Sequence, residues 1–232
     1  MCLGKYVPAS DKVEVIVKAL CDKSPRTMNE LAGILVRKLG LKFSTARSAI
    51  SRIVGELIED DVLEDVGANS KGSRLIDISP TGAYIMSYIL PDVKKKFISK
   101  NDLLNFLSRK NSEAAEVLEV YYVIRRKIEE LEDYSFGEAL TTAAEFEDVE
   151  IDNWDKLAEE LISLCTREIE RYLDKKGGIL DLREIVSRLS EKTKKVYGKI
   201  LYAYLDAIND EIMKLELRKE KVKDLLREVM EL

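Results

Sequence analysis

The chain has 232 residues, of which 46% are hydrophobic and 35% are charged, and its formal net charge is −5. This length and composition allow one large folded domain or two of ordinary size, and they exclude disorder along the whole chain. No apolar run approaches the roughly 18–20 residues of a membrane span, and the first residues lack a secretory signal, so no membrane association is expected.

Several absences bear on chemistry. Histidine is missing, which removes the commonest general base and the commonest transition-metal ligand. Cys2, Cys21 and Cys165 form no CxxC pair, which favours a reducing interior over a disulfide framework or a zinc site. No phosphate-binding loop, dinucleotide-binding glycine motif or zinc-protease motif occurs. We therefore expect neither an enzyme nor a bound cofactor or metal ion.

Glutamine is also missing, while lysine and glutamate are abundant. This composition is typical of proteins from hot environments and favours a thermophilic, archaeal source.

Charge is distributed unevenly along the chain. Residues 1–98 carry 15 basic and 12 acidic side chains, whereas residues 99–232 carry 23 and 31. The first part is therefore the candidate for a polyanionic partner, and the acidic second part is a candidate surface for a protein partner.

Three helices are predicted at the N-terminus. Residues 10–23 place apolar side chains three and four positions apart, as one face of a helix does. Thr27 and Glu30 form a capping box that opens a second helix, and Gly40 is a C-cap residue that ends it. A third helix follows over residues 44–59, beginning at Ser44. Its predicted buried face consists of Ala46, Ile50, Ile53 and Leu57.

The outward face of helix 44–59 is small, polar and basic, with no carboxylate before Glu56. Such a face fits the major groove of DNA, where hydroxyl groups reach phosphates or base edges and arginine contacts guanine. The alternative is the solvated face of an ordinary helical unit. The candidate DNA contacts on this helix are Ser44, Thr45, Arg47, Ser48, Ser51 and Arg52.

Two β-compatible runs, at residues 62–66 and 74–78, flank a loop with two glycines and predict a β-hairpin. Lys71 and Arg74, in the hairpin segment 67–74, are candidate phosphate contacts. After the hairpin, Ser79 and Pro80 supply the N-cap and first position of a further helix.

The order helix, turn, helix, hairpin, helix over residues 10–90, together with the run RLIDISPTGAYIM, resembles the winged helix-turn-helix of MarR- and PadR-like transcription regulators. The resemblance implies binding of double-stranded DNA, with helix 44–59 in the major groove and hairpin 67–74 as the wing. Those regulators usually add one or two dimerisation helices, whereas about 140 residues follow position 91 here. The resemblance therefore leaves the subfamily, the dimer geometry and any ligand pocket open.

We predict a mainly α fold: an N-terminal winged helix with a small β-hairpin, and a C-terminal all-helical domain ending in a long heptad-bearing helix. The expected division is a DNA-binding domain at 8–91, a linker at 92–98 and a dimerisation or partner domain at 99–232. The basic run Lys94 to Lys96 is interpreted as a solvated linker or, alternatively, as a further group of phosphate contacts. Helices are expected at 101–110, 112–134, 135–148, 153–176 (capped by Asp152), 181–190 and 191–230.

The last helix carries an apolar heptad seam with one polar member, Lys219. In a parallel pair, Glu211 would face Glu216 and Arg218 would face Lys223. Both contacts join like charges, which favours antiparallel pairing or packing against the protein's own helices. Aromatic residues near this helix could instead line an effector pocket: Tyr121, Tyr122, Trp154, Tyr172, Tyr197, Tyr202 and Tyr204. The candidate dimerisation seam is Leu201, Leu205, Ile208, Ile212, Leu215, Lys219, Val222, Leu226 and Val229.

These patterns favour a sequence-specific DNA-binding transcription regulator, cytoplasmic and nucleoid-associated, that forms a homodimer through its C-terminal helices. Such a dimer would place two recognition helices roughly 34 Å apart on a pseudo-palindrome. One alternative is a protein-docking scaffold of a DNA-linked complex. Another is a non-specific binder of DNA in chromatin or plasmid partition.

Overall fold

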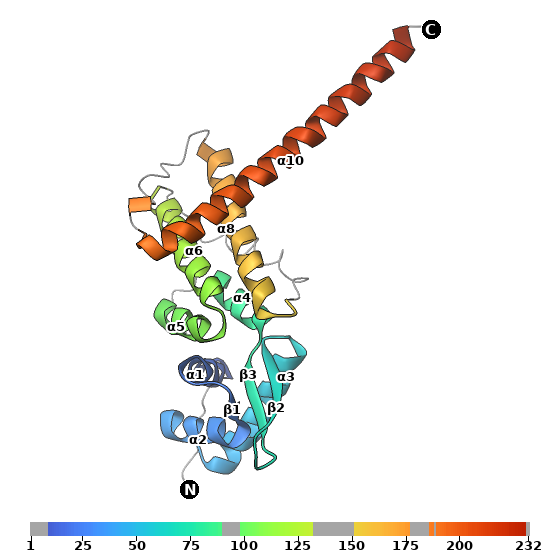
Figure 1. Ribbon diagram of the computed structural model, residues 1–232. Coiled ribbons are helices and arrows are strands. Elements are labelled where there is room, and N and C mark those ends of the chain that lie inside the picture. The colour runs from blue at the N-terminus through green and yellow to red at the C-terminus, as the bar shows by residue number, and fades with distance from the viewer. Residues whose placement is uncertain (1–8, 90–97, 132–150, 177–185, 188, 231–232) are drawn as a thin grey trace.

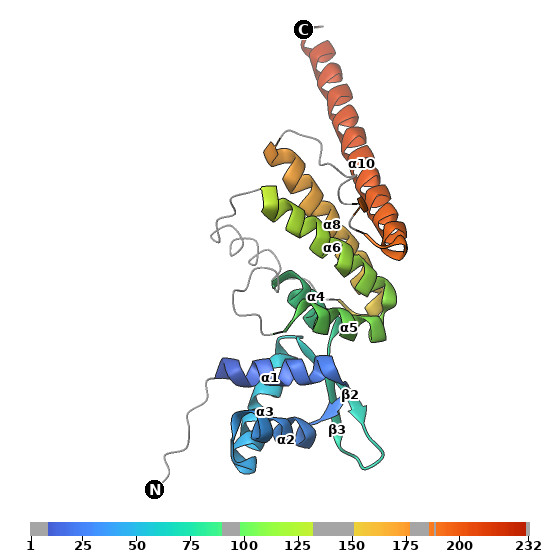
Figure 2. The same ribbon diagram turned by 90° about the vertical axis from the view of Figure 1, so that its left-hand side faces the viewer.

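The computed structural model describes residues 9–89, 98–131, 151–176, 186–187 and 189–230. The fold is mainly α-helical with a long C-terminal helix, as predicted. The predicted β-hairpin is part of a small antiparallel sheet of three strands. In Figures 1 and 2, the sheet and the first three helices form one end of the molecule, and the last helix projects from the other end. None of the described helices has the length and apolar character needed to cross a membrane.

Three helices share a core at the N-terminal end: α1 (Ala9–Asp22), α2 (Met28–Leu39) and α3 (Phe43–Glu59). The capping box at the start of α2 is confirmed, since Glu30 N donates to Thr27 Oγ1 at 3.2 Å and Thr27 N donates to the Glu30 carboxylate at 2.7 Å. Gly40 ends α2 with φ of 68°, a left-handed conformation that glycine adopts without strain. Side chains buried in this core include Ile16, Leu20, Leu31, Leu35, Ala46, Ile50 and Ile53.

The sheet has the strand order β1-β3-β2. Strands β2 (Leu63–Ala68) and β3 (Arg74–Ile78) form the predicted hairpin. Strand β1 (Arg26–Thr27) was not predicted, because two residues are too few to produce a periodic pattern. It pairs antiparallel with β3, and this pairing ties the start of α2 to the hairpin.

Helix α4 (Pro80–Ile89) follows the sheet and is capped as expected, because Gly82 N donates to Ser79 Oγ at 2.8 Å. Its first turn lies against the backbone that leads into β2. A Cβ atom on Gly82 would be only 2.1 Å from the carbonyl oxygen of Val62. Glycine at this position therefore permits a close approach that any other residue would prevent.

A second group of described helices consists of α5 (Lys100–Lys110), α6 (Ser112–Leu131), α8 (Trp154–Lys176) and α10 (Glu191–Met230). Helices α6 and α8 lie side by side, and the first turns of α10 pack across both (Figures 1 and 2). A buried ion pair joins α6 to α8, with Arg125 Nη1 2.9 Å from Glu168 Oε1.

Two details of this group bear on the predicted helices. Asn153 caps α8, accepting from the backbone N–H groups of Asp155 and Lys156, so the prediction that Asp152 is the cap was wrong. The helix expected at 135–148 lies outside the described residues, as does most of the one expected at 181–190.

The described residues share one continuous hydrophobic core from Ile16 in α1 to Ile200 in α10. Helix α1 packs on α5, and Tyr84 of α4 accepts a hydrogen bond from Arg167 of α8 at 2.9 Å. Most of the predicted linker lies outside the described residues. The division into 8–91, 92–98 and 99–232 therefore stays a prediction.

Candidate nucleic-acid interface

Helix α3 is held by one buried face, formed by Ala46, Ile50, Ile53 and Val54. It begins at Phe43, one residue before the expected start, and Lys42 is its N-cap residue without a side-chain capping bond. The opposite face is exposed and has no carboxylate in its first turn. All six side chains expected on this face are exposed: Ser44, Thr45, Arg47, Ser48, Ser51 and Arg52.

The two arginines of this face differ in their surroundings. Arg52 Nη1 lies 3.9 Å from Glu56 Oε1, and the two side chains are 63% and 58% exposed, so this contact is weak. Arg47 has no carboxylate partner in the part of the chain that the structure describes. Its guanidinium is therefore available to an external anion.

The tip of the β2–β3 hairpin is held by Asn69. Its side-chain oxygen accepts from Lys71 N and from Ser73 N, each at 3.0 Å, and Gly72 N donates to the Asn69 carbonyl at 2.8 Å. Gly72 has φ of 75°, which this tight turn requires. The turn presents the exposed Lys71 side chain at the end of the hairpin.

Arg74, the other expected hairpin contact, is engaged within the protein. Its Nε atom forms an ion pair with Asp65 on the adjacent strand. The N–H of Gly67 and this arginine hold the pKa of Asp65 below its ordinary value. Arg74 is half exposed, but the Asp65 carboxylate already neutralises part of its positive charge. Lys71 is therefore the hairpin cation that is better placed to bind an external phosphate.

Further cations lie beside the start of α3 and were not among the predicted contacts. Arg37 and Lys38 are exposed in the last turn of α2, and Lys42 is exposed just before α3. Sequence reasoning missed them because basic residues near a helix C-terminus are accounted for by the helix dipole. The turn between α2 and α3 and the hairpin tip both lie at the end of the molecule farthest from the C-terminus (Figures 1 and 2).

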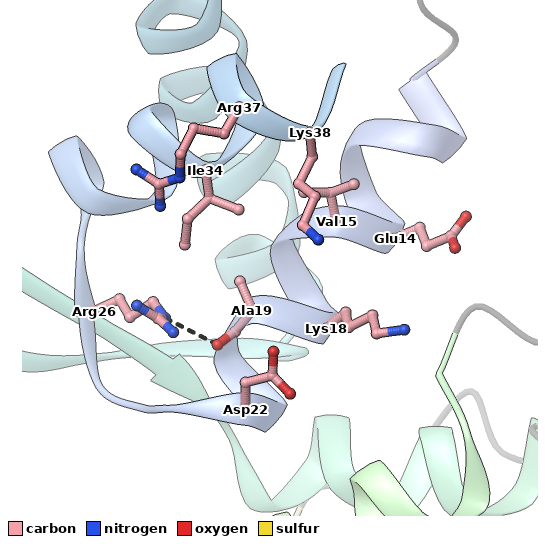
Figure 3. A pocket seen from close by; sticks show the side chains of 9 residues that line it. All are labelled: Glu14, Val15, Lys18, Ala19, Asp22, Arg26, Ile34, Arg37 and Lys38. Carbon is pink, nitrogen blue, oxygen red and sulfur yellow. Dashed lines mark hydrogen bonds between the residues drawn. The ribbon is translucent and has the colours of Figure 1, made fainter. Parts of the chain in front are cut away.

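A cleft with a volume of about 410 Å³ lies between α1 and α2 (Figure 3). Its charged lining mixes four cations with two carboxylates, so the cleft alone does not define an anion site. Arg26 is fixed there by a hydrogen bond of 2.9 Å from Nε to the carbonyl of Ala19. The lining residues are Glu14, Val15, Lys18, Ala19, Asp22, Arg26, Ile34, Arg37 and Lys38.

The aromatic residues considered for an effector pocket differ in how deeply they are buried. Tyr121, Tyr122 and Tyr197 are buried in the helical core, and burial raises the pKa of Tyr197 to about 12. Trp154 packs edge-on against Phe106, with ring centroids 5.8 Å apart. Within the described ranges, acidic and cysteine side chains form no group that could hold a metal ion. The rings of Tyr121, Tyr122, Tyr197 and Trp154 therefore belong to the packed interior, and Tyr204 is partly buried against it. Tyr202 is 72% exposed, and the side chain of Tyr172 lies outside the described residues.

The predicted heptad seam runs along α10 and out of the helical body. Leu201 packs against the core, whereas Leu205, Ile212, Leu215 and Val222 are exposed. Ile208 is half-buried and Lys219 is exposed, and the side chains of Leu226 and Val229 lie outside the described residues.

Comparisons of the chain with models of protein families, with curated proteins and with solved structures gave no match.

Proposed function

We propose that residues 9–89 form a winged helix-turn-helix and that the chain is a sequence-specific DNA-binding transcription regulator, acting in the cytoplasm at the nucleoid. The order α1, β1, α2, α3, β2, β3 supports this, because it presents a third helix beside a two-stranded hairpin. DNA-binding proteins of the helix-turn-helix class insert the equivalent helix into the major groove.

The observation that carries the proposal is the exposed face of α3, which has no carboxylate before Glu56. The B-DNA major groove is about 12 Å wide and admits one helix, provided that no acidic side chain meets the phosphates. Ser44, Thr45 and Ser48 are short enough to allow close approach, and Arg47 can contact guanine through two hydrogen bonds. The acidic residues of this region, Glu56 to Asp61, lie at the other end of the helix.

Cations around α3 supply the sequence-independent part of the interaction. Lys71 at the hairpin tip, and Arg37 and Lys38 at the end of α2, are exposed and suited to phosphate contacts. Neutralising phosphates releases condensed counterions, so the affinity for DNA should fall steeply as the salt concentration rises.

The test is to select bound duplexes from a random pool and to measure their affinity by fluorescence anisotropy. Arg47→Ala should weaken binding to the selected duplex by about tenfold or more, with a smaller effect on unrelated duplexes. Lys195→Ala is the matched control, since Lys195 is an exposed cation on α10, away from α3. Equal affinities for wild type and Arg47→Ala would remove α3 as the recognition helix.

Two other outcomes lead to different functions. Salt-sensitive binding without any preferred sequence would indicate a non-specific binder of chromatin or plasmid DNA. Feeble retention of DNA together with salt-insensitive binding of a protein would indicate a docking scaffold, with the acidic helical half as its contact surface.

A further inference from the structure

The C-terminal half of α10 leaves the helical body and has no neighbour among the described residues. Val196, Tyr197 and Ile200 are buried against α6 and α8, but every described side chain from Asn209 to Asp224 is exposed. Figures 1 and 2 both show this half projecting away from the rest of the molecule. Most of the stability of a protein helix comes from packing of its apolar face, so a partner for this segment is expected.

The apolar side chains of the projecting half follow a heptad pattern. Leu205, Ile212 and Lys219 occupy one core position of the heptad, and Ile208, Leu215 and Val222 occupy the other. Because the segment points away from its own body, these side chains cannot pack against α6 or α8. A two-stranded pair with another helix of the same kind buries the whole seam.

We propose that two copies of this chain pair through the projecting halves of α10, antiparallel, with Ile212 of each copy facing Leu215 of the other. In this register, Leu205 faces Val222 of the second copy, and Ile208 faces Lys219. Every described seam residue beyond the body then has a partner. The pairing does not depend on the proposed DNA-binding function.

Charges flanking the seam select this arrangement. In an antiparallel pair, residues that precede the first core position of each heptad face one another across the interface. The register above places Glu211 beside Arg218 of the second copy, and by symmetry Arg218 beside Glu211. On the other flank, it places Lys223 beside the ring of Tyr202, an exposed aromatic that a cation can contact.

Competing arrangements bring like charges together. A shift by one heptad in one direction would place Arg218 against Arg218 of the second copy. The same shift in the other direction would place Glu211 against Glu211. Parallel pairing would set Glu211 against Glu216 and Arg218 against Lys223. Like charges in contact weaken helix pairing, so the antiparallel register with Ile212 opposite Leu215 is the favoured one.

The pairing has a consequence for DNA that does rest on the proposed function. Tyr204 is the last described residue of α10 that packs against the core, and in this register it lies level with residue 223 of the second copy. At 1.5 Å per residue, the two bodies are then attached about 29 Å apart along the pair. The body lies on the side of Tyr204 opposite to the projecting half of α10, and α3 lies at the end of the body farthest from the C-terminus (Figures 1 and 2). The two α3 helices therefore lie farther apart than one DNA turn of roughly 34 Å, and the dimer bridges two DNA segments.

The seam is tested by comparing two leucines of similar exposure. Leu215 is 54% exposed and lies on the seam, whereas Leu217 is 60% exposed and lies outside it. Sedimentation analysis should give a dimer for wild type and for Leu217→Asp, and a monomer for Leu215→Asp. Both residues are remote from the body, so circular dichroism should show the body folded in each variant. Monomeric wild type, or equal loss of the dimer in both variants, would overturn the pairing.

Charge reversal distinguishes antiparallel from parallel pairing by the sign of its effect. Glu211→Arg and Arg218→Glu should each weaken the dimer, by about tenfold in dissociation constant, because each creates two like-charged contacts. Combining the two should restore the wild-type value. In a parallel pair, each single reversal would create opposite-charge contacts and tighten the dimer, and that result would overturn the antiparallel arrangement.

Cross-linking tests the register itself. In a Cys2→Ser background, a mixture of Leu205→Cys and Val222→Cys chains should form disulfide-linked heterodimers, and neither chain should cross-link alone. Cys21 and Cys165 are buried and can be retained. Cross-linking of each variant with itself would indicate a parallel pair and contradict the proposal.

DNA bridging is measured separately, by pull-down of a free duplex on a tethered duplex of the selected sequence. Wild type should bridge the two duplexes, and Leu215→Asp should bind each without bridging. A dimer that binds no DNA would contradict the proposed function and leave the pairing intact. A dimer that binds DNA without bridging would overturn the inferred placement of the two α3 helices.

Discussion

The ammonium group of Lys110 lies 2.5 Å from the carboxylate of Asp77, and this ion pair joins the central strand of the sheet to α5. The Asp77 side chain is almost fully buried, and Lys110 is about three-quarters buried. The same ammonium lies 5.5 Å from the centre of the Trp154 ring. The pair thus anchors the N-terminal end of the molecule to the helical body.

We expect Lys110→Met to destabilise the protein by about 3 kcal/mol, because it leaves the buried Asp77 carboxylate without its counter-charge. Adding Asp77→Asn should recover most of the loss. Urea denaturation of the single and double variants measures both effects. Lys199→Met is the control, since the ion pair of Lys199 with Glu113 is exposed and should contribute less than about 1 kcal/mol. Similar losses in the two single variants would contradict the anchoring role.

Glu64 lies directly opposite Asp77 across β2 and β3. Burial and the Asp77 charge raise the pKa of Glu64 above its ordinary value of 4.5, and Lys110 offsets part of this. A raised pKa means that protonated Glu64 favours the folded state. The contribution of protonated Glu64 to the free energy of unfolding is fully present below pH 4.5, and it is lost as the pH rises through the raised pKa.

Glu64→Gln should therefore stabilise the protein at pH 7, by a few tenths of a kcal/mol because the side chain is only half-buried. At pH 4 the same change should have little effect. Thermal denaturation at the two pH values provides the measurement, with Glu59→Gln as a control at an exposed position. A loss of stability at pH 7 would show that the ionised carboxylate is favoured instead.

The two glycines Gly82 and Gly55 should respond in opposite directions to alanine. At Gly82 the new Cβ would meet the Val62 carbonyl at 2.1 Å, which forces α4 away from the sheet and should cost about 3 kcal/mol or more. At Gly55, within α3, the new Cβ has no atom within 4 Å apart from its chain neighbours and the nearby backbone of its own helix. Alanine there should add about 0.5–1 kcal/mol to the free energy of unfolding, measured by urea denaturation. Equal effects at the two positions would contradict the close approach of α4.

Lys71→Ala should reduce the salt dependence of DNA binding as well as the affinity. Loss of one phosphate contact lowers the slope of log affinity against log salt concentration by about 0.9. Because a phosphate contact carries no base information, the loss should be similar on selected and unrelated duplexes. Titrations at four salt concentrations give the slope, with Lys195→Ala expected to leave it unchanged. An unaltered slope in Lys71→Ala would remove the hairpin tip from the interface.

The amino-acid sequence by itself determined the local structure. The capping box of Thr27 and Glu30, the C-cap at Gly40 and the hairpin were all predicted, because each depends on residues only a few positions apart. The exposed face of α3 was predicted for a similar reason. Helical periodicity fixes which side chains point outward once the buried face has been recognised.

Tertiary structure decided the contacts between distant residues. Arg74 pairs with Asp65 because of the register of two strands, and Lys110 reaches Asp77 because α5 packs beside the sheet. The two-residue strand β1 exists only because β3 lies next to it. The sequence showed a heptad seam along α10, but it did not show at which residue α10 stops packing against the other helices. That point depends on how far α6 and α8 extend beside α10, a non-local packing arrangement that no spacing within one helix encodes.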